Sequence, residues 1–184
     1  MRFLIFPFML LAGAGFLLSL CIHLGAILEV PIPEAWRPWV REYIPSTLGT
    51  GIFVIWLPAV LLSTRVPGAH RVTGMSWSVL LRGCPVWMRN LCIAVFIYGF
   101  ISFFFGISML DNLSEDWGDT RIFTGHYLIF YGAGFAIMFS IFNKPDIMQP
   151  IRCALGHEMG VDDQYCAMCG RKREPVSDNG QVHH

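Results

Sequence analysis

Charged side chains are scarce in this chain, and their scarcity argues against a soluble domain. Only 14% of the 184 residues are charged, whereas 54% are hydrophobic and the mean hydropathy is +0.53. A typical soluble domain has about 25% charged residues. The 13 basic and 13 acidic residues cancel, so the chain also lacks the net positive field that gathers nucleic acid. These values predict a protein whose main solvent is lipid.

Long apolar stretches occur four times, at residues 3–28, 46–64, 91–110 and 122–142. Each can cross a hydrocarbon core of about 30 Å, which takes about 20 helical residues. Their backbones must be helical, because unpaired amides in lipid cost several kcal/mol each. A cleaved signal peptide is an alternative for the first stretch. Its apolar run continues well beyond the small residues 12–14, which favours a retained span.

Basic residues are distributed unevenly between the segments that connect these spans. One side of the membrane would carry Arg2, four arginines between the second and third spans, and five basic residues after Phe142. The other side would carry only Arg37, Arg41 and Arg121. Because Lys and Arg are retained in the cytoplasm, we expect both termini on the cytoplasmic side.

Two connecting segments have the spacing of amphipathic helices. Between the first two spans, Trp36, Trp39, Val40 and Tyr43 recur at helical intervals among prolines, which predicts a short interfacial helix. Between spans two and three, an apolar series predicts a basic helix on the inner leaflet, bent near Gly83 and Pro85. Its apolar residues are Trp77, Leu80, Leu81, Cys84, Trp87, Met88 and Leu91.

The arginines of this second segment predict contact with the lipid surface. They are Arg65, Arg71, Arg82 and Arg89, and no acidic residue lies among them. Each such charge is worth about 1 kcal/mol near anionic lipid. We interpret Cys84 as a packed apolar residue, with acylation or redox sensing as alternatives.

Polar and small residues within the spans suggest how the helices pack. Gly15, Ser19 and His23 step by four in the first span, and Gly132, Ala136 and Ser140 do so in the last. Such stripes allow close approach of helix backbones. His23 and His126 should lie at similar depth, and buried imidazoles can mark a proton, haem or metal site. His126 points away from the stripe of its own helix, which favours structural roles for the pair.

After Pro150 the composition changes to a set of metal ligands. Cys153 and His157 are followed by the pair Cys166 and Cys169, within 17 residues. A Cys-x-x-Cys turn brings two thiolates to one ion, and Gly156 and Gly170 permit the two turns that this requires. We expect Tyr165 to pack over the small core. A disulfide among the three cysteines is the alternative, but it suits an oxidising compartment, whereas the charge distribution predicts a cytosolic tail.

The pattern Cys153-x3-His157 with Tyr165-Cys166-x2-Cys169-Gly170 resembles the short zinc ribbons at the termini of bacterial membrane and regulatory proteins. The resemblance implies a structural Zn²⁺, no reaction, and a bacterial cytoplasmic membrane. It covers about 20 residues, and it departs from the usual pattern because His157 at x3 spacing replaces a second cysteine at x2. Arg152, Arg171, Lys172 and Arg173 can partly balance the charge of such a site.

The sequence thus predicts an all-α membrane protein with four transmembrane helices and two interfacial amphipathic helices. A transmembrane domain would occupy residues 1–145, a zinc ribbon 150–173 and a disordered tail 174–184. No nucleophile and base pair, phosphate loop or intramembrane carboxylate pair occurs, so we expect a membrane adaptor or regulator, not an enzyme. Its expected partners are the lipid bilayer and a protein or a second copy, not nucleic acid. The alternative is a small redox or transport component that uses His23 and His126.

Overall fold

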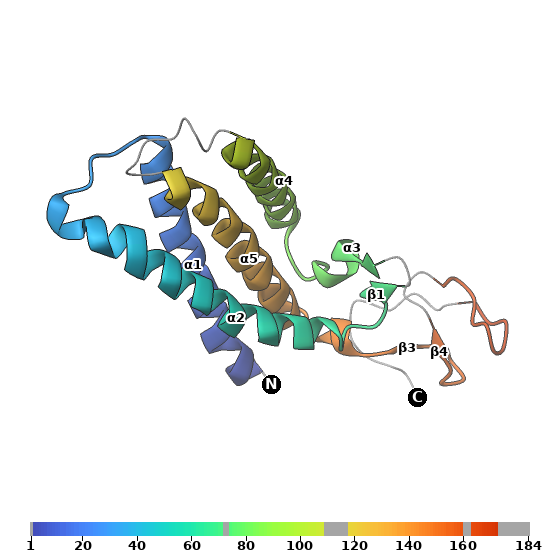
Figure 1. The fold of residues 1–184 in the computed structure, drawn as a ribbon. Coiled ribbons are helices and arrows are strands. Elements are labelled where there is room, and N and C mark those ends of the chain that lie inside the picture. The colour runs from blue at the N-terminus through green and yellow to red at the C-terminus, as the bar shows by residue number, and fades with distance from the viewer. Residues whose placement is uncertain (1, 72–73, 109–117, 160–162, 173–184) are drawn as a thin grey trace.

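The computed structural model describes residues 2–71, 74–108, 118–159 and 163–172, and it is mostly helical (Figure 1). Helices α1 (Arg2–Ile27), α2 (Ile44–Ser63), α4 (Val86–Ser108) and α5 (Gly118–Asn143) form a bundle. Each contains a segment long and apolar enough to cross a membrane. The four predicted spans are therefore present as helices. Pro58 lies inside α2 without ending it.

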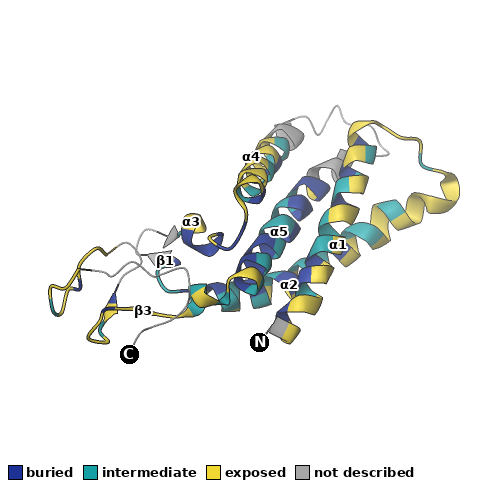
Figure 2. Ribbon diagram, turned by 180° about the vertical axis from the view of Figure 1, so that it is seen from behind, coloured by how far each residue is buried: buried dark blue, intermediate teal, exposed yellow. Residues whose placement is uncertain are grey.

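Helix α5 lies at the centre of this bundle. It packs against α1, α2 and α4, and Figure 2 shows it between α1 and α4. In its apolar segment 56% of the residues are buried, compared with 11% in α4. The main core accordingly contains many α5 side chains, including Tyr131, Ile137 and Ile141. The other helices have broad faces of exposed apolar side chains.

The small-residue stripes face helix interfaces. Ser19 and Ala136 are fully buried, and Ser140 is buried as well. A side chain added at Gly15 would overlap the Tyr131 ring, so glycine is needed where α1 meets α5. The hydroxyl of Tyr131 reaches α2, where it donates a hydrogen bond of 2.8 Å to the Leu48 carbonyl. Close approach of backbones therefore organises the bundle.

The connection between α1 and α2 is not the separate interfacial helix that the sequence predicts. It contains a 3₁₀ turn, η1 (Glu34–Trp36), and a π-helical segment, η2 (Trp39–Tyr43), which continues directly into α2. Trp36, Trp39 and Tyr43 are exposed, as an interfacial position would require. The prolines divide the predicted helix into these pieces.

The connection between α2 and α4 is also not one long amphipathic helix. It contains strands β1 (His70–Arg71) and β2 (Gly74–Met75), which pair with each other, and the short helix α3 (Trp77–Leu80). Gly83 and Pro85 separate α3 from α4, where the sequence predicts a bend. Val79, Leu80 and Leu81 are buried in the main core, so this segment packs against protein along that face.

Hydrogen bonds attach this segment to the end of α5. The Gly83 amide donates to Ser140 Oγ at 2.9 Å, and Asn143 Nδ2 donates to the Gly83 carbonyl at 2.9 Å. A Cβ at Gly83 would overlap the backbone carbonyl of Ser140. The absence of a side chain at residue 83 is therefore what lets the two backbones meet.

Beyond α5 the chain leaves the bundle. A 3₁₀ turn, η4 (Pro145–Met148), leads to strands β3 (Ile151–Arg152) and β4 (Glu158–Met159), which pair antiparallel. Figure 1 shows this hairpin beyond the end of the bundle, on the side of α3. Ile147, Met148 and Ile151 pack against the main core, whereas the turns that follow have a small core of their own.

Candidate metal centre

The first pair of candidate ligands lies at the turn of the β3–β4 hairpin. The Cys153 amide donates to the His157 carbonyl at 2.9 Å, and the Gly156 amide donates to the Cys153 carbonyl at 2.8 Å. Gly156 has φ +81°, a left-handed conformation that other residues rarely adopt. The turn predicted at Gly156 is therefore present, and it brings Cys153 and His157 to the same side.

The second pair lies on a similar turn. The Cys166 amide donates to the Arg171 carbonyl at 2.8 Å, and the Gly170 amide donates to the Cys166 carbonyl at 2.8 Å. Gly170 has φ +67°. An isolated bridge between Tyr165 and Lys172 closes the base of this turn. Both turns thus require a glycine directly beside a ligand.

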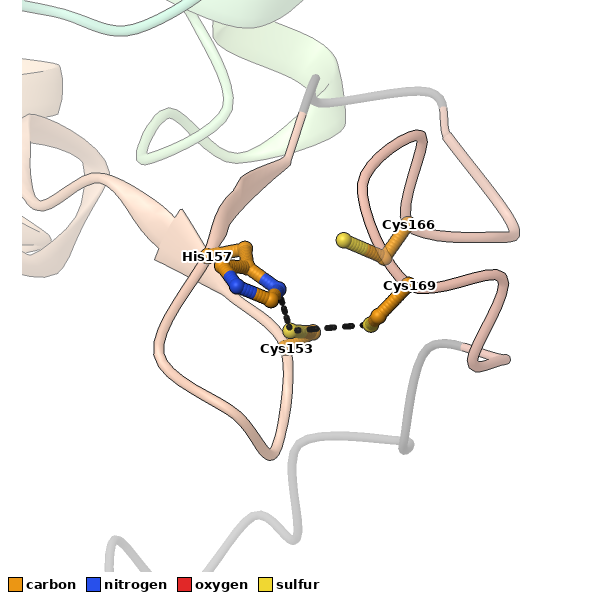
Figure 3. A group of neighbouring side chains, drawn as sticks. All are labelled: Cys153, His157, Cys166 and Cys169. Atoms are coloured by element: carbon orange, nitrogen blue, oxygen red, sulfur yellow. Dashed lines mark hydrogen bonds between the residues drawn. The ribbon is translucent and has the colours of Figure 1, made fainter.

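The four predicted ligands converge on one point (Figure 3). The thiols of Cys153, Cys166 and Cys169 and a ring nitrogen of His157 lie within 4.8 Å of one another. His157 Nδ1 lies 3.6 Å from Cys153 Sγ, and the Sγ atoms of Cys153 and Cys169 are 3.7 Å apart. A tetrahedral ion bound to sulfur at about 2.3 Å and nitrogen at about 2.0 Å would separate sulfurs by ~3.8 Å and sulfur from nitrogen by ~3.5 Å. The arrangement therefore fits a metal ion.

The three cysteines of the tail do not form a disulfide in this structure. All three are free thiols, and two sulfurs 3.7 Å apart are far from the bond length of about 2.0 Å. The disulfide alternative thus has no support in the geometry, whereas the metal alternative does.

The surroundings favour one thiolate before any ion binds. Burial raises the pKa of Cys153, but hydrogen bonds from the Leu155 and His157 amides and from neighbouring thiols lower it by more, to about 6. The Arg171 amide lowers the pKa of Cys169, but burial and the adjacent thiols raise it by more. A second thiolate would be repelled by the first, and a bound cation removes that repulsion.

The core under the four ligands is very small. Cys153, Met159 and Cys166 are buried, and only Ile151 and Cys169 pack against them among the described apolar residues. The prediction that Tyr165 covers this core is wrong, since Tyr165 is 58% exposed. Met159 takes that place, because the pairing of β3 with β4 brings it opposite Ile151.

Several large apolar side chains point outward from the two turns. Leu155 is 53% exposed and Met168 is 78% exposed, and both lie between the ligands of their turns. Together with Tyr165 they form what we call the knuckle surface (Leu155, Tyr165, Met168). Three basic residues of the same turns, Arg152, Arg171 and Lys172, are exposed as well. The ion pair of Arg152 with Glu158, at 3.9 Å, is exposed on both sides and adds little stability. Arg173 and the tail predicted at 174–184 lie outside the described residues.

The second candidate site, His23 and His126, has a different character. His23 is 1% exposed, and its Nδ1 lies 2.8 Å from Thr124 Oγ1 while its Nε2 lies 2.7 Å from the Tyr98 hydroxyl. These bonds join α1 to α5 and α4. The ring of His126 packs edge-on against Phe103 of α4, with 4.1 Å between centroids. Sequence reasoning missed Thr124 and Tyr98, because no local pattern marks two single hydroxyl groups on other helices.

The predicted lipid-facing arginines lie at one end of the bundle. Arg65 follows α2 and is exposed, Arg71 belongs to β1, and Arg82 follows α3 and is exposed. Arg89 lies in the first turn of α4 and is half-buried. Cys84, in the same segment, is buried, and its thiol lies 3.2 Å from the Ala136 carbonyl. Burial and the nearby Cys92 raise the pKa of Cys84 to about 11, which favours the packed role over a reactive one.

No protein-family model, curated protein or solved structure matches this chain. What it does must therefore be argued from the two sites themselves.

Proposed function

We propose that this chain is an integral membrane adaptor or regulatory protein. Four transmembrane helices would hold a structural zinc ribbon at the cytosolic face, and the ribbon would contact another protein or a second copy of the chain. The observation that carries this proposal is the convergence of three thiols and one imidazole within 4.8 Å.

The donor set supports zinc and a structural role. Sulfur and nitrogen donors in tetrahedral geometry are the preferred environment of Zn²⁺ in proteins. Four protein ligands leave no coordination position for water or substrate, unlike the three ligands of catalytic zinc. Three thiolates around a doubly charged ion leave one negative charge, and Arg152, Arg171 and Lys172 lie close enough in sequence to balance it.

The knuckle surface supports a role in protein contact. Exposed apolar residues on a small polar module are typical of interaction sites, because they gain free energy when a partner covers them. Leu155 and Met168 occupy the tips of turns that the metal would make rigid. A rigid apolar tip loses little conformational entropy on binding.

The adaptor role can be tested by photo-crosslinking in native membranes. A photo-reactive amino acid at Met168 should give one product of discrete mass, and Cys169→Ser should abolish that product because the turn loses its metal. The same probe at exposed Asp146, in η4, is the control and should give no such product. A product of twice the chain mass identifies a second copy as the partner. Equal labelling with and without Cys169 would contradict the proposal.

The orientation can be tested independently. A reporter fused after His184 should be active only when the tail is cytoplasmic, and one inserted near Asp116 should report the opposite side. The reverse pattern would place the ligand cluster in an oxidising compartment and remove the argument for reduced thiols.

The redox or transport alternative depends on the histidines. Both ring nitrogens of His23 have hydroxyl groups within 2.8 Å, so neither nitrogen is presented to a haem iron in this arrangement. This favours the adaptor. A Soret band in purified protein that disappears in His23→Ala or His126→Ala would instead favour the alternative.

A further inference from the structure

An apolar groove lies between α1 and α4. Its volume is about 540 Å³, and α5 forms its floor. Figures 1 and 2 both show α1 and α4 on opposite sides of α5. The floor is low because two of its residues, Gly132 and Ala133, are small, and Gly13 leaves further room on the α1 wall.

The lining of this groove is almost wholly apolar. Phe16 and Leu17 of α1 face Ile93 and Phe96 of α4 across it. A volume of this size is typical of a pocket for a small molecule, within the usual range of roughly 300–1,000 Å³. Apart from Trp77 and Leu81 of the α3 segment, the lining residues belong to the segments of α1, α4 and α5 that are long and apolar enough to cross a membrane. The available ligand of matching chemistry at that depth is an acyl chain.

Two arginines, Arg82 and Arg89, lie beside lining residues at one end of the groove, although neither belongs to the lining itself. Trp77 and Trp87 line that end, as expected of side chains at the level of lipid headgroups. Arg89 lies one turn before Cys92 and Ile93 on the same face of α4, and Arg82 directly follows the lining residue Leu81. Residues 64–89 contain no Asp or Glu. Within the described part of the chain, neither arginine forms an ion pair.

We propose that this groove is a binding site for one anionic phospholipid. Its acyl chain would lie between α1 and α4, and its phosphate would contact Arg82 and Arg89. The groove alone would accept the chain of any phospholipid, so the arginines provide the preference for negative charge. The assignment to the inner leaflet rests on the proposed topology, but the binding itself does not.

Native mass spectrometry of the delipidated full-length protein in detergent tests this site. Phosphatidylglycerol should bind in one copy at low concentration, and phosphatidylcholine should bind more weakly. Ala133→Phe places a ring on the groove floor and should reduce the binding of both lipids about tenfold or more. The double variant Arg82→Gln, Arg89→Gln should remove the preference for phosphatidylglycerol, by about fivefold for each arginine.

Two further variants serve as a control and as a second test of the groove. Ala94→Phe makes the same change at an exposed position of α4 outside the lining and should leave binding unchanged. If Ala133→Phe does not give a monodisperse protein, Gly13→Leu fills the groove from α1, where an added Cβ meets Phe135 at an ordinary 3.5 Å. Inorganic phosphate should not compete at the concentrations of the lipid. Equal affinity for the two lipids, equal effects of the two Phe variants, or a dimer held by this face would each overturn the proposal.

Discussion

The helical bundle and the tail show two ways of stabilising a structure with little internal core. In the bundle, broad apolar faces are exposed, and the helices meet where glycine, serine and alanine allow close approach, as at Gly15 and Gly83. In the described part of the tail, three buried residues and two neighbours form the core, and four ligand atoms converge instead. Packing of the bundle therefore depends on small residues that leave room at the helix contacts. Folding of the tail depends on the four metal ligands that its two turns bring together.

This difference implies that the two regions fail independently. Changes that remove ligands should unfold the tail and leave the helices intact. Changes that add atoms at a helix contact should loosen the bundle and leave metal content unchanged. Four predictions, in decreasing order of expected effect, test this independence.

The largest effect is expected from loss of a thiolate or of the ion. Cys169→Ser, or a strong chelator, should reduce zinc from one ion per chain to nearly none and make the tail sensitive to protease. Structural zinc contributes an apparent 10–16 kcal/mol or so in small zinc-binding peptides, more than a core of this size could replace. Elemental analysis, limited proteolysis and helical circular dichroism are the measurements. Cys21→Ser, at an exposed cysteine of α1, is the control. A tail that stays protected without metal would refute the prediction.

The next effect concerns the unusual fourth ligand. His157→Ala should weaken zinc binding by less than Cys169→Ser does, because three thiolates remain and water can fill the vacant position. His157→Cys should preserve binding, since four thiolates also suit Zn²⁺. Cobalt substitution should report the change of ligand set by its visible bands. An unchanged spectrum in His157→Ala would show that the fourth ligand comes from elsewhere in the chain.

A smaller effect is expected at the contact between the α3 segment and α5. Gly83→Ala should lower the free energy of unfolding of the bundle by about 1–3 kcal/mol, as overpacking does. The reason is that the new Cβ would overlap the Ser140 carbonyl. Thermal unfolding in detergent is the measurement. Gly13→Ala, whose Cβ would make an ordinary contact with Phe135, is the control and should change little. Loss of zinc in Gly83→Ala would show that the two regions are coupled.

The smallest effect is expected from a single hydrogen bond. Tyr131→Phe removes the donor to the Leu48 carbonyl but keeps the ring against Gly15. Hydrogen bonds between membrane helices are worth about 0.6 kcal/mol on average, so the loss should be of that order. Tyr43→Phe, at an exposed tyrosine, serves as the comparison. A loss several times larger would mean that the hydroxyl organises the bundle more than close packing does.

Local patterns explain what the sequence could predict. The spans and the ligand turns depend on runs of neighbouring residues, so their existence could be read from hydropathy and from the spacing of Cys153, His157, Cys166 and Cys169. Span ends were less accurate. The α4 helix begins at Val86, although the uninterrupted apolar run begins only at Leu91, because Arg89 and Asn90 are among its first five residues.

Contacts between residues far apart in the sequence could not be predicted from local patterns. Nothing near Gly83 indicates that its amide meets Ser140, and nothing near His23 indicates Thr124 or Tyr98. The predicted long inner helix was wrong for the same reason. Periodicity marked its apolar residues correctly, but it could not show that α5 covers several of them.

The central position of α5 also has a consequence for biogenesis. α5 is the last of the four candidate spans to leave the ribosome, yet it is the helix against which α1, α2 and α4 all pack. Until it inserts, His23 lacks Thr124, and the amide of Gly83 lacks Ser140. α1 and α2 contact each other without α5, but the contacts of all three helices with α5 are still missing at that stage. The contacts of α5 are thus the last to become possible, and a chain interrupted before Gly118 would lack the hydrogen-bond partners of His23 and Gly83 on α5.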